Sequence, residues 1–419
     1  MKTVMIVTGE SSGELYGSLL AKALKSRFRD LRILGIGGDR MGKAGVELIS
    51  GISGAFGFAE LVSSLRDLRI AFQKTKTAIR KSLPHVLILI DFPDFNIKVA
   101  EFAKPLGVKI LYYVSPQVWA WRKSRVKKLA GLVDRMAVVL PFETEIYKNA
   151  GVACEFVGHP IVEEIETVLQ STNPPPPLFN SPLSKGARLP SVGQGYRGVK
   201  GGFEGIINPE LRTYLKTSLG FDAQLPLLSL LPGSRSHELK RLLPLMIDVI
   251  KHFKKEFMDY QLCIPIAPNT DEEKYSHYLS ALSHEGAAIK KGESIKALAA
   301  SDMAVIASGT ATLQAALLEV PMVVIYKLSP LTYFLGKFLI NIKHISLVNI
   351  LSGREVVPEL IQQRASPEGI IKELKKIMAD KTYKEEMISY YRLIKRLFGG
   401  LRASQRVTDI IGEMAGWKQ

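Results

Sequence analysis

Residues 4–14 read VMIVTGESSGE. Five uncharged residues lead to Gly9, and small residues then open a stretch with helical spacing. A short continuous apolar run is typical of a strand buried on both faces of a parallel sheet. A turn of small residues after such a strand exposes backbone N–H groups to a ligand, as in dinucleotide-binding folds. The spacing is not GxGxxG, because Glu10 occupies the turn, so a capped turn is the alternative interpretation.

The same alternation of strand and helix continues along the chain. Comparable apolar runs occupy residues 32–36, 86–90, 109–114 and 135–140 in the first half, and 227–231, 262–267, 303–307 and 322–326 in the second. Helical patterns separate them. We therefore predict an α/β protein with two doubly wound, Rossmann-like domains that face each other across a ligand cleft.

The composition changes between residues 171 and 208. Four consecutive prolines begin there at Pro174, and Gly and Ser are frequent. Because no apolar period is sustained, we predict an insertion or linker. The expected organisation is a first domain over residues 1–170, the insertion over 171–208, a second domain over 209–366, and C-terminal helices over 367–419 that pack back on the first domain.

The charge balance indicates an anionic partner. The 419 residues include 56 basic and 40 acidic side chains, a net charge of +16. Such an excess suits nucleic acid, anionic lipid or a phosphorylated substrate. The start lacks the layout of a secretory signal, and the longest uncharged apolar stretch is too short to span a bilayer. Cys154 and Cys263 cannot form a disulfide framework, so we expect a cytoplasmic protein.

Two carboxylates follow the run at residues 86–90, in the string DFPDFN at 91–96. Asp91 and Asp94 therefore lie at the carboxyl end of a buried strand, where open α/β sheets bind ligands. A helix cap is the alternative role for Asp94, and the motif alone does not decide between the two. No third metal-binding side chain lies nearby in sequence, so we predict neither a metal nor a cofactor.

Two further strand ends lead into helices through small residues. They carry Gly233, Ser234 and Arg235, and then Ser308, Gly309 and Thr310. The N–H groups and dipole of a helix start favour a phosphate, and a guanidinium adds bidentate recognition. Two such starts in one domain indicate a diphosphate site. The chain has no GxxxxGK[ST] string, which argues against a P-loop nucleotidase.

Aromatic and amphipathic stretches suggest a greasy ligand or a membrane. Trp119 and Trp121 follow another strand end and can stack on a sugar or fill an interdomain gap. Apolar residues at helical spacing lie beside Arg66, Arg69 and Lys76. A basic amphipathic helix of this kind can lie on an anionic bilayer, although such a stripe is more often core.

Strings along nearly the whole chain together resemble the bacterial lipid-A-disaccharide synthase family, inverting glycosyltransferases of GT-B architecture. They are GESSGE at 9–14, DFPDFN at 91–96, YVSPQVWAWR at 113–122, PFE at 141–143, VGHP at 157–160, LPGSR at 231–235, ASGTATLQAAL at 307–317 and LVNILSGREVVPELIQ at 347–362. They follow the family's order, and VSPQVWAWR together with SGTAT is hard to meet by chance.

The resemblance implies a specific reaction in lipid A biosynthesis. A 2,3-diacylglucosamine unit would pass from UDP-2,3-diacylglucosamine to 2,3-diacylglucosamine 1-phosphate (lipid X) with inversion. The products would be a β-1,6-linked disaccharide 1-phosphate and UDP. The family works without a metal as a peripheral protein on the inner face of the inner membrane, so an anionic membrane surface is an expected partner. Family members can form dimers through the C-terminal region, which leaves a homodimer open.

Matched positions imply the residues that bind each substrate. UDP would be held in the second domain by Gly233, Ser234, Arg235, Ser308, Gly309 and Thr310, framed by Gln314, Asn349 and Glu355. The acceptor would be held in the first domain by Glu10, Ser12 and Gly13, with Asp94 as general base and Asp91 in support. His159 in VGHP is the alternative base, because a histidine titrates near neutrality.

Three departures from the family pattern stand out. Glu14 stands where an Asp is usual, and the insertion has no counterpart. Gln314 stands where many members carry Glu, whose carboxylate could accept hydrogen bonds from ribose hydroxyls. The alternative functions are another GT-B UDP-sugar transferase or a UDP-sugar epimerase. A basic RNA-binding protein ranks lower, because RRM and KH signatures are missing, so no nucleic acid partner is expected.

Overall fold

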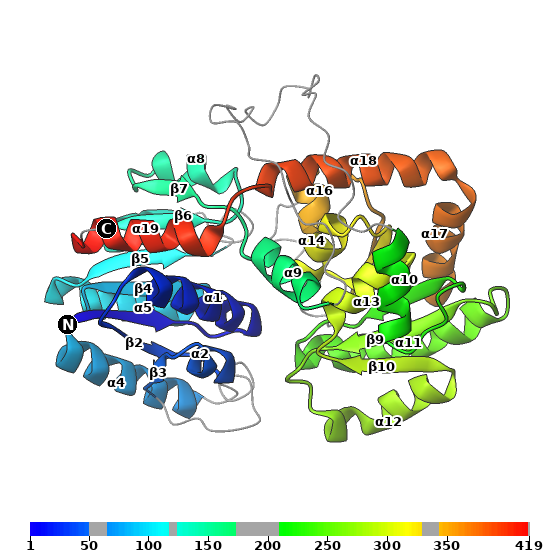
Figure 1. Ribbon diagram of the computed structural model, residues 1–419, viewed down its shortest axis with the longest axis horizontal. Coiled ribbons are helices and arrows are strands. Elements are labelled where there is room, and N and C mark those ends of the chain that lie inside the picture. The colour runs from blue at the N-terminus through cyan, green and yellow to red at the C-terminus, as the bar shows by residue number, and fades with distance from the viewer. Residues whose placement is uncertain (50–64, 117–123, 173–208, 329–342, 418–419) are drawn as a thin grey trace. The chain divides into compact units, whose positions relative to one another are not determined.

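The computed structural model describes residues 1–49, 65–116, 124–172, 209–328 and 343–417 (Figure 1). The chain divides into two compact units. Unit 1 consists of Met1–Glu163 and Leu401–Gln419, and unit 2 of Glu164–Gly400. Each unit is built on its own parallel sheet, which confirms the expectation of two doubly wound α/β folds.

Unit 1 contains a seven-stranded sheet in the order β3-β2-β1-β4-β5-β6-β7. The strands are β1 Lys2–Val7, β2 Leu31–Ile36, β3 Glu47–Leu48, β4 Val86–Ile90, β5 Lys109–Tyr113, β6 Arg135–Val138 and β7 Cys154–Phe156. The strand order reverses between β1 and β4, so the carboxyl ends of these neighbours form the topological switch point where such sheets bind ligands.

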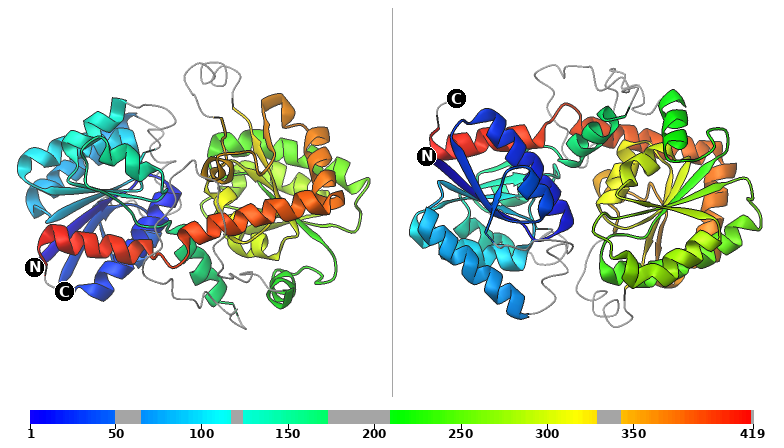
Figure 2. Two further views of the ribbon diagram at one scale, coloured as in Figure 1. Left: turned by 90° about the horizontal axis from the view of Figure 1, so that it is seen from above. Right: turned by 60° about the horizontal axis from the view of Figure 1, so that its bottom comes forward.

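Helices cover the sheet of unit 1 because its central strands are apolar on both faces. They are α1 Ser11–Arg27, α2 Asp39–Lys43, α4 Leu65–Ser82, α5 Pro93–Ala103, η1 Lys104–Leu106, α7 Ser124–Leu132, α8 Glu143–Lys148 and α19 Ala403–Ala415. Helix α1 packs against α19, while α5 contacts both α4 and α7 (Figure 2). The second group buries the face that carries Met5 and Leu87.

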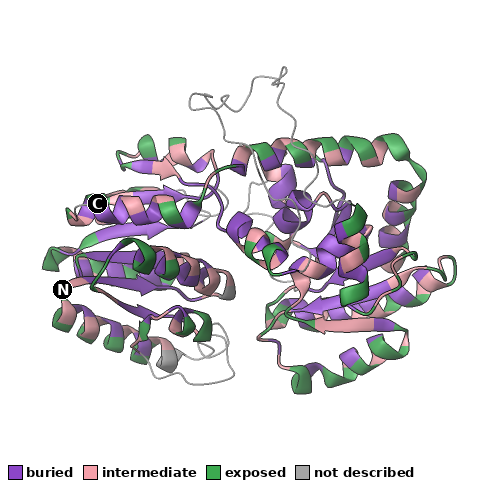
Figure 3. Ribbon diagram, viewed as in Figure 1, coloured by how far each residue is buried: buried purple, intermediate pink, exposed green. Residues whose placement is uncertain are grey.

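Unit 2 repeats the plan with six strands in the order β10-β9-β8-β11-β12-β13. They are β8 Leu227–Leu231, β9 Gln261–Ile266, β10 Ala287–Lys291, β11 Met303–Ala307, β12 Met322–Tyr326 and β13 Glu359–Ile361. The switch point lies between β8 and β11, where Leu231 pairs with Ile306. Strands of the sheet are buried, whereas the outer faces of its helices are exposed (Figure 3).

The helices of unit 2 connect these strands and continue past the last one. They are α9 Ile161–Gln170 from Glu164 onward, α10 Pro209–Ser218, α11 Ser236–Lys254, α12 Glu272–His284, α13 Ser294–Ala300, α14 Thr310–Leu317, α16 Leu347–Ser352, η2 Gln362–Arg364, α17 Pro367–Ala379 and α18 Lys381–Phe398. The domain boundaries expected from the sequence stay predictions. The two units differ from these expected domains in two ways. Residues 164–170 belong to unit 2. Of the C-terminal helices, α17 packs on α11 and α18 on α14 within unit 2, whereas α19 belongs to unit 1.

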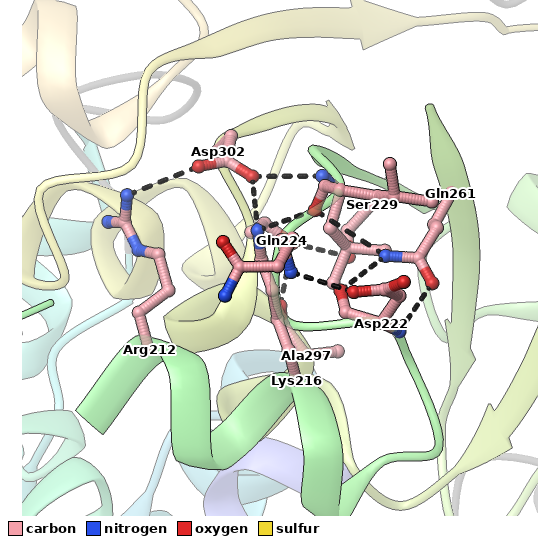
Figure 4. A network of polar contacts seen from close by, with 11 residues as sticks. Arg212, Lys216, Asp222, Gln224, Ser229, Gln261, Ala297 and Asp302 are labelled. Atoms are coloured by element: carbon pink, nitrogen blue, oxygen red, sulfur yellow. Dashed lines mark hydrogen bonds and ion pairs between the residues drawn. The ribbon is translucent and has the colours of Figure 1, made fainter. Parts of the chain in front are cut away.

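A polar network anchors α10, the first described element after residue 208 (Figure 4). The Lys216 ammonium lies 2.9 Å from the Asp302 carboxylate and donates to the Leu225 carbonyl oxygen. Asp302 also accepts the backbone N–H of Leu227, and Arg212 lies 3.5 Å from its second oxygen. The network ties α10 to the amino ends of β8 and β11, the sheet edge opposite the switch point.

Candidate functional site

The family-like strings share one structural position. Within the described residues, GESSGE follows β1, DFPDFN follows β4, the start of YVSPQVWAWR ends β5, PFE follows β6 and VGHP follows β7. In unit 2, LPGSR follows β8 and ASGTATLQAAL follows β11. Because parallel strands end at the same sheet edge, these strings lie along the carboxyl edge of each sheet, and those after β1 and β4, and after β8 and β11, flank the switch points.

In unit 1 the loops after β1 and β4 are in contact. A Cβ added to Gly9 would lie 2.4 Å from the ring of Phe92, so only glycine permits this approach. Gly13 is required for a similar reason, because its Cβ would lie 2.3 Å from the buried hydroxyl of Thr8. Gly13 therefore allows the start of α1 to pack against Thr8. Glu10 and Ser12, at the same helix start, are partly exposed and can reach a ligand.

The backbone after β4 and β5 is strained. Asp91, Phe92 and Val114 have φ values of 50°, 46° and 62°, a region that costs a residue with a side chain about 1–3 kcal/mol. Hydrogen bonds hold this conformation: the Asp91 carbonyl oxygen accepts from the Tyr112 hydroxyl and from the Asn96 amide, each at 2.7 Å. Asn96 is fully buried, and its Oδ1 has no partner among the described residues.

Asp94 lies on the first turn of α5 and faces solvent. Its side chain is 79% exposed and forms an ion pair with Arg125 of α7. Asp91, by contrast, is only partly exposed and directly follows Ile90, the last residue of β4. The structure thus separates the two carboxylates: one is accessible to a substrate, and the other belongs to the strained backbone that supports it.

Glu14, the longer acid at its position, reaches the neighbouring loop. Its Oε1 accepts the Arg40 N–H at 2.8 Å, at the start of α2. A Cβ on Gly38 would lie 2.5 Å from the same oxygen, so that glycine makes room for the carboxylate. Glu14 therefore joins two loops at the carboxyl edge of the sheet.

The structure contradicts the expectation that His159 titrates near neutrality. Its side chain is 3% exposed, and burial lowers its pKa to about 3. Nδ1 accepts the backbone N–H of Ile161, and the Tyr16 ring packs edge-on against the imidazole. A neutral, buried imidazole with so low a pKa is a poor general base at neutral pH.

Glu143, in the PFE string, is a buried carboxylate that the sequence analysis did not single out. It is 1% exposed, accepts the Ser115 hydroxyl at 2.6 Å, and accepts the Leu140 N–H. Ser115 follows Val114 directly. Through this hydrogen bond Glu143, in the loop after β6, holds the loop after β5 in place. Its only signal in the sequence is its place in the family-like string.

In unit 2 the start of α11 differs from the expected phosphate site. The N–H groups of Ser234 and Arg235 already donate to Oε2 of Glu238, at 3.0 and 3.1 Å. Glu238 is 6% exposed, and Gly233 at φ 91° leaves room for it, because a Cβ there would lie 2.2 Å from Oε2. These N–H groups therefore already donate to an internal carboxylate, and the expectation that Gly233 and Ser234 bind phosphate stays a prediction. The Arg235 side chain remains 55% exposed.

The start of α14 has no such internal anion among the described contacts. Ser308 is held by its hydroxyl, which donates to the Ile345 carbonyl oxygen at 2.9 Å. Gly309 and Thr310 are exposed, and a Cβ on Gly309 would meet no atom of the described residues within 4 Å. Gln314, one turn later, is 9% exposed, and its amide donates to Glu164 at 3.2 Å.

Asn349 does not point at a ligand. It is fully buried: its Nδ2 donates to the Val357 carbonyl oxygen and to Glu359, and its Oδ1 accepts the N–H groups of Val356 and Val357. Asn349 therefore fixes the turn that carries Glu355, which is exposed. The expectation that the two residues help to frame the donor site stays a prediction.

Glu359 completes this network and was also missed in the sequence analysis. It is 6% exposed and accepts the N–H groups of Ile345 and Ser346. Because Ser308 bonds to the Ile345 carbonyl oxygen, the strings ASGTATLQAAL and LVNILSGREVVPELIQ are joined through one buried carboxylate.

Several expectations fall outside the described residues. These are Trp119 and Trp121, most of the insertion, and the side chain of Arg66. Within the part of the chain that is described, no group of three or more His, Cys, Asp or Glu side chains could hold a metal ion. No helix in that part is long and apolar enough to cross a bilayer.

A model of the lipid-A-disaccharide synthetase family matches residues 4–173 and 204–406. The chain belongs to this family. The lipid-A-disaccharide synthase of Geobacter metallireducens is 37% identical over 420 residues, covering 100% of this chain and 98% of the relative. That of Nitrosococcus oceani is 39% identical over 398 residues, covering 94% and 92%. As a member of the lipid-A-disaccharide synthetase family, the protein is a glycosyltransferase of lipid A biosynthesis. The family model skips residues 174–203, inside the expected insertion.

Solved structures show the same fold. The UDP-GlcNAc 2-epimerase of Neisseria meningitidis bound to UDP-GlcNAc has a TM-score of 0.65 at 8% identity, covering 99% of this chain and 100% of that one. The Methanocaldococcus jannaschii enzyme in complex with UDP-GlcNAc and UDP has a TM-score of 0.58 at 14% identity, covering 99% and 100%. At these identities the likeness shows the fold alone, and it confirms the expected GT-B architecture. Membership of the lipid-A-disaccharide synthetase family decides against the epimerase and RNA-binding alternatives.

Proposed function

We propose that this glycosyltransferase moves a 2,3-diacylglucosamine unit from UDP-2,3-diacylglucosamine to the 6-hydroxyl of 2,3-diacylglucosamine 1-phosphate. The proposal rests on the family-like strings that lie along the carboxyl edge of each sheet and flank its switch point. Unit 2 would bind the donor and unit 1 the acceptor, so turnover requires both edges to act on one substrate pair.

The donor diphosphate is assigned to the start of α14 together with the Arg235 side chain. Leu231 pairs with Ile306, so the loops after β8 and β11 are neighbours at one sheet edge. The N–H groups of Gly309 and Thr310 open a helix whose dipole favours an anion, and the open space beside Gly309 admits it. Arg235 adds a guanidinium that neutralises charge on the leaving UDP.

Asp94 is assigned as the general base. The acceptor hydroxyl gives its proton to the Asp94 carboxylate while its oxygen bonds to C1 of the donor sugar. The bond from C1 to the UDP oxygen breaks at the same time, and its electron pair leaves with the β-phosphate. Attack opposite the leaving group inverts C1. Such a base contributes about 10²–10⁴-fold.

Asp91 is assigned to support rather than proton transfer. Its carbonyl oxygen is fixed by Tyr112 and Asn96, and its left-handed backbone directs the start of α5. Glu10 and Ser12, on the adjoining loop, are assigned to the border of the acceptor site.

The test is mass spectrometry of the products from the two acylated sugars. A disaccharide monophosphate and one equivalent of UDP are expected. Replacing the donor with UDP-N-acetylglucosamine should abolish the product if the acyl chains are recognised. A failure to form disaccharide, or isomerisation of the UDP-sugar without transfer, would overturn the proposal.

We further propose that unit 1 contacts an anionic membrane surface through α4, as a peripheral protein. Arg69, Lys74 and Lys81 are exposed on this helix, and Ile70 beside them is 46% exposed. Lys76 lies 4.8 Å from the centre of the Phe102 ring, so its charge is partly engaged by an aromatic face. Basic side chains near a bilayer contribute about 1 kcal/mol each on anionic lipid.

Vesicle binding tests the membrane contact. The triple variant Arg69→Glu, Lys74→Glu, Lys81→Glu should bind anionic vesicles more weakly, and added salt should weaken the wild type. The matched control reverses Lys372, Lys375 and Lys376 of α17. Equal loss in both triples would show that net charge, and not α4, controls binding.

A further inference from the structure

Helices α9 and α14 bring a carboxylate and an amide together beside the assigned diphosphate position. The Gln314 Nε2 lies 3.2 Å from Oε2 of Glu164, within unit 2. Gln314 is 9% exposed, and Glu164 is partly exposed. We infer that Glu164, oriented by Gln314, accepts hydrogen bonds from the ribose hydroxyls of the nucleotide, an inference that rests on the proposed donor site.

The position along α14 fits a nucleoside diphosphate. Gln314 follows Thr310, at the helix start, by four residues, which is about one turn or ~5 Å of rise. Helical side chains lean toward the N-terminus, so the amide lies nearer the helix start than its own Cα does. A ribose is joined directly to its α-phosphate. A diphosphate at the start of α14 therefore places the ribose within about one helical turn.

The chemistry of the pair suits neighbouring hydroxyls. A carboxylate accepts two hydrogen bonds through its two oxygens, and charged acceptors bind hydroxyl groups more strongly than neutral ones. Gln314 carries no charge, so it can lie against Glu164 without repulsion and fix its orientation. A second carboxylate at 3.2 Å would instead repel the first. The single negative charge of the pair thus comes from α9.

The alternative is that the pair is a brace, meaning a hydrogen bond that only joins two helices. The two roles predict different effects of substitution on the affinities for UDP and for 2′,3′-dideoxy-UDP. A brace affects every nucleotide equally. A ribose contact affects UDP and leaves 2′,3′-dideoxy-UDP unchanged, because the dideoxy ligand has no hydroxyl to donate. A site that loses its acceptor leaves the hydroxyls poorly paired, which typically costs about tenfold in affinity.

Calorimetry on the full chain tests this inference with UDP and 2′,3′-dideoxy-UDP. Glu164→Gln should weaken UDP about tenfold and leave the dideoxy ligand unchanged. The exchange variant Glu164→Gln/Gln314→Glu returns one carboxylate to the pair and should bind UDP within about threefold of wild type. Glu166→Gln is the matched control, because a residue two positions along a helix faces another side.

The outcomes separate this inference from the proposed function. If wild type binds UDP and Glu164→Gln weakens both ligands equally or neither, the pair is a brace and the inference is wrong while the donor site stands. If wild type binds UDP without preference over the dideoxy ligand, the inference is also wrong. If wild type binds no UDP, the proposed donor site fails and the inference fails with it.

Discussion

The two switch points are built differently. At the edge of unit 1, Asp91, Phe92 and Val114 hold left-handed backbone without being glycines. At the switch point of unit 2, the left-handed residue is Gly233, a glycine that adopts this backbone without strain, and its loop is held by the buried carboxylate of Glu238. Among the described residues, the left-handed non-glycine residue at this sheet edge is Gln362, which follows the outer strand β13. The loop after β4 stores conformational strain, whereas the loop after β8 satisfies the N–H groups of Ser234 and Arg235 internally.

This difference matches the two proposed roles. Backbone strain concentrates where reacting groups must be held against their preferred conformation, and unit 1 carries the assigned base. Recognition of an anion needs donors that do not reorganise, and unit 2 provides loops fixed by buried carboxylates. A substitution at one edge should therefore leave the function assigned to the other edge intact.

The largest effect is expected at Asp94. Asp94→Asn keeps the size of the side chain but cannot take up a proton, so turnover should fall about 10²–10⁴-fold. Glu101→Gln is the control, because Glu101 lies on the same helix and pairs with Lys128. Steady-state kinetics measure both. Near-normal turnover in the Asn variant would move the role of base away from Asp94.

Arg235→Ala weakens the other edge. Loss of a charged contact to phosphate should reduce UDP affinity about 10- to 100-fold, with little change in the unfolding midpoint, since the side chain is largely exposed. Arg241→Ala, on the same helix, should leave UDP affinity unchanged. Titration calorimetry that finds equal affinities for wild type and Arg235→Ala would exclude this contact.

Substitutions at two glycines of unit 2 should affect stability and UDP affinity separately. Gly233→Ala forces a side chain into left-handed backbone beside Glu238 and should destabilise the protein by about 1–2 kcal/mol. Gly309→Ala enters open space and should leave stability unchanged while weakening UDP binding. Denaturant unfolding and UDP titration of both variants measure this. A Gly309→Ala variant with unaltered UDP affinity would show that the ligand does not use that space.

Acid should lower the free energy of unfolding of unit 1 through protonation of His159 in the unfolded chain. Its pKa is lowered from 6.5 to about 3 by burial, so the unfolded chain binds the proton first. The stability that depends on neutral His159 is complete above about pH 6.5 and falls as pH decreases toward 3, by about 1.4 kcal/mol per pH unit. The slope should be shallower in His159→Gln. Unfolding at pH 4, 5 and 7 measures it, and identical slopes would mean that His159 is not buried as a neutral base.

The smallest effect is expected from the insertion. Deleting residues 174–202 should leave turnover and UDP affinity nearly unchanged, because the stretch lacks periodic apolar residues and the family model skips residues 174–203. The deletion variant should show the same melting temperature as the full chain. A well-folded deletion variant without activity would assign a function to the insertion.

The sequence predicted the inner strands well because they are buried on both faces. The runs at residues 86–90, 227–231, 303–307 and 322–326 coincide with β4, β8, β11 and β12. The missed strands β3, β7, β10 and β13 are the four sheet edges. Edge strands are short and partly exposed, as in AAIKK of β10, so they lack a continuous apolar run.

The strings predicted where the candidate residues lie in the fold, but not which buried side chains hold them there. Asp94, Arg235 and Gly309 lie at the expected strand ends. Glu143, Glu238 and Glu359 were missed, because each is a single glutamate and its hydrogen bonds leave no motif in the sequence. All three accept backbone N–H groups, and Glu143 and Glu359 also accept from the side chains of Ser115 and Asn349. The low pKa of His159 was missed for a related reason. It results from burial of the side chain, and the burial of one side chain cannot be read from its neighbours in sequence.

The division of labour between the two edges is tested most directly by UDP calorimetry on Asp94→Asn. The account predicts wild-type affinity for UDP in this variant together with the loss of turnover, because the donor site is assigned to unit 2 and the base to unit 1. An Asp94→Asn variant that has lost both UDP affinity and turnover would contradict it.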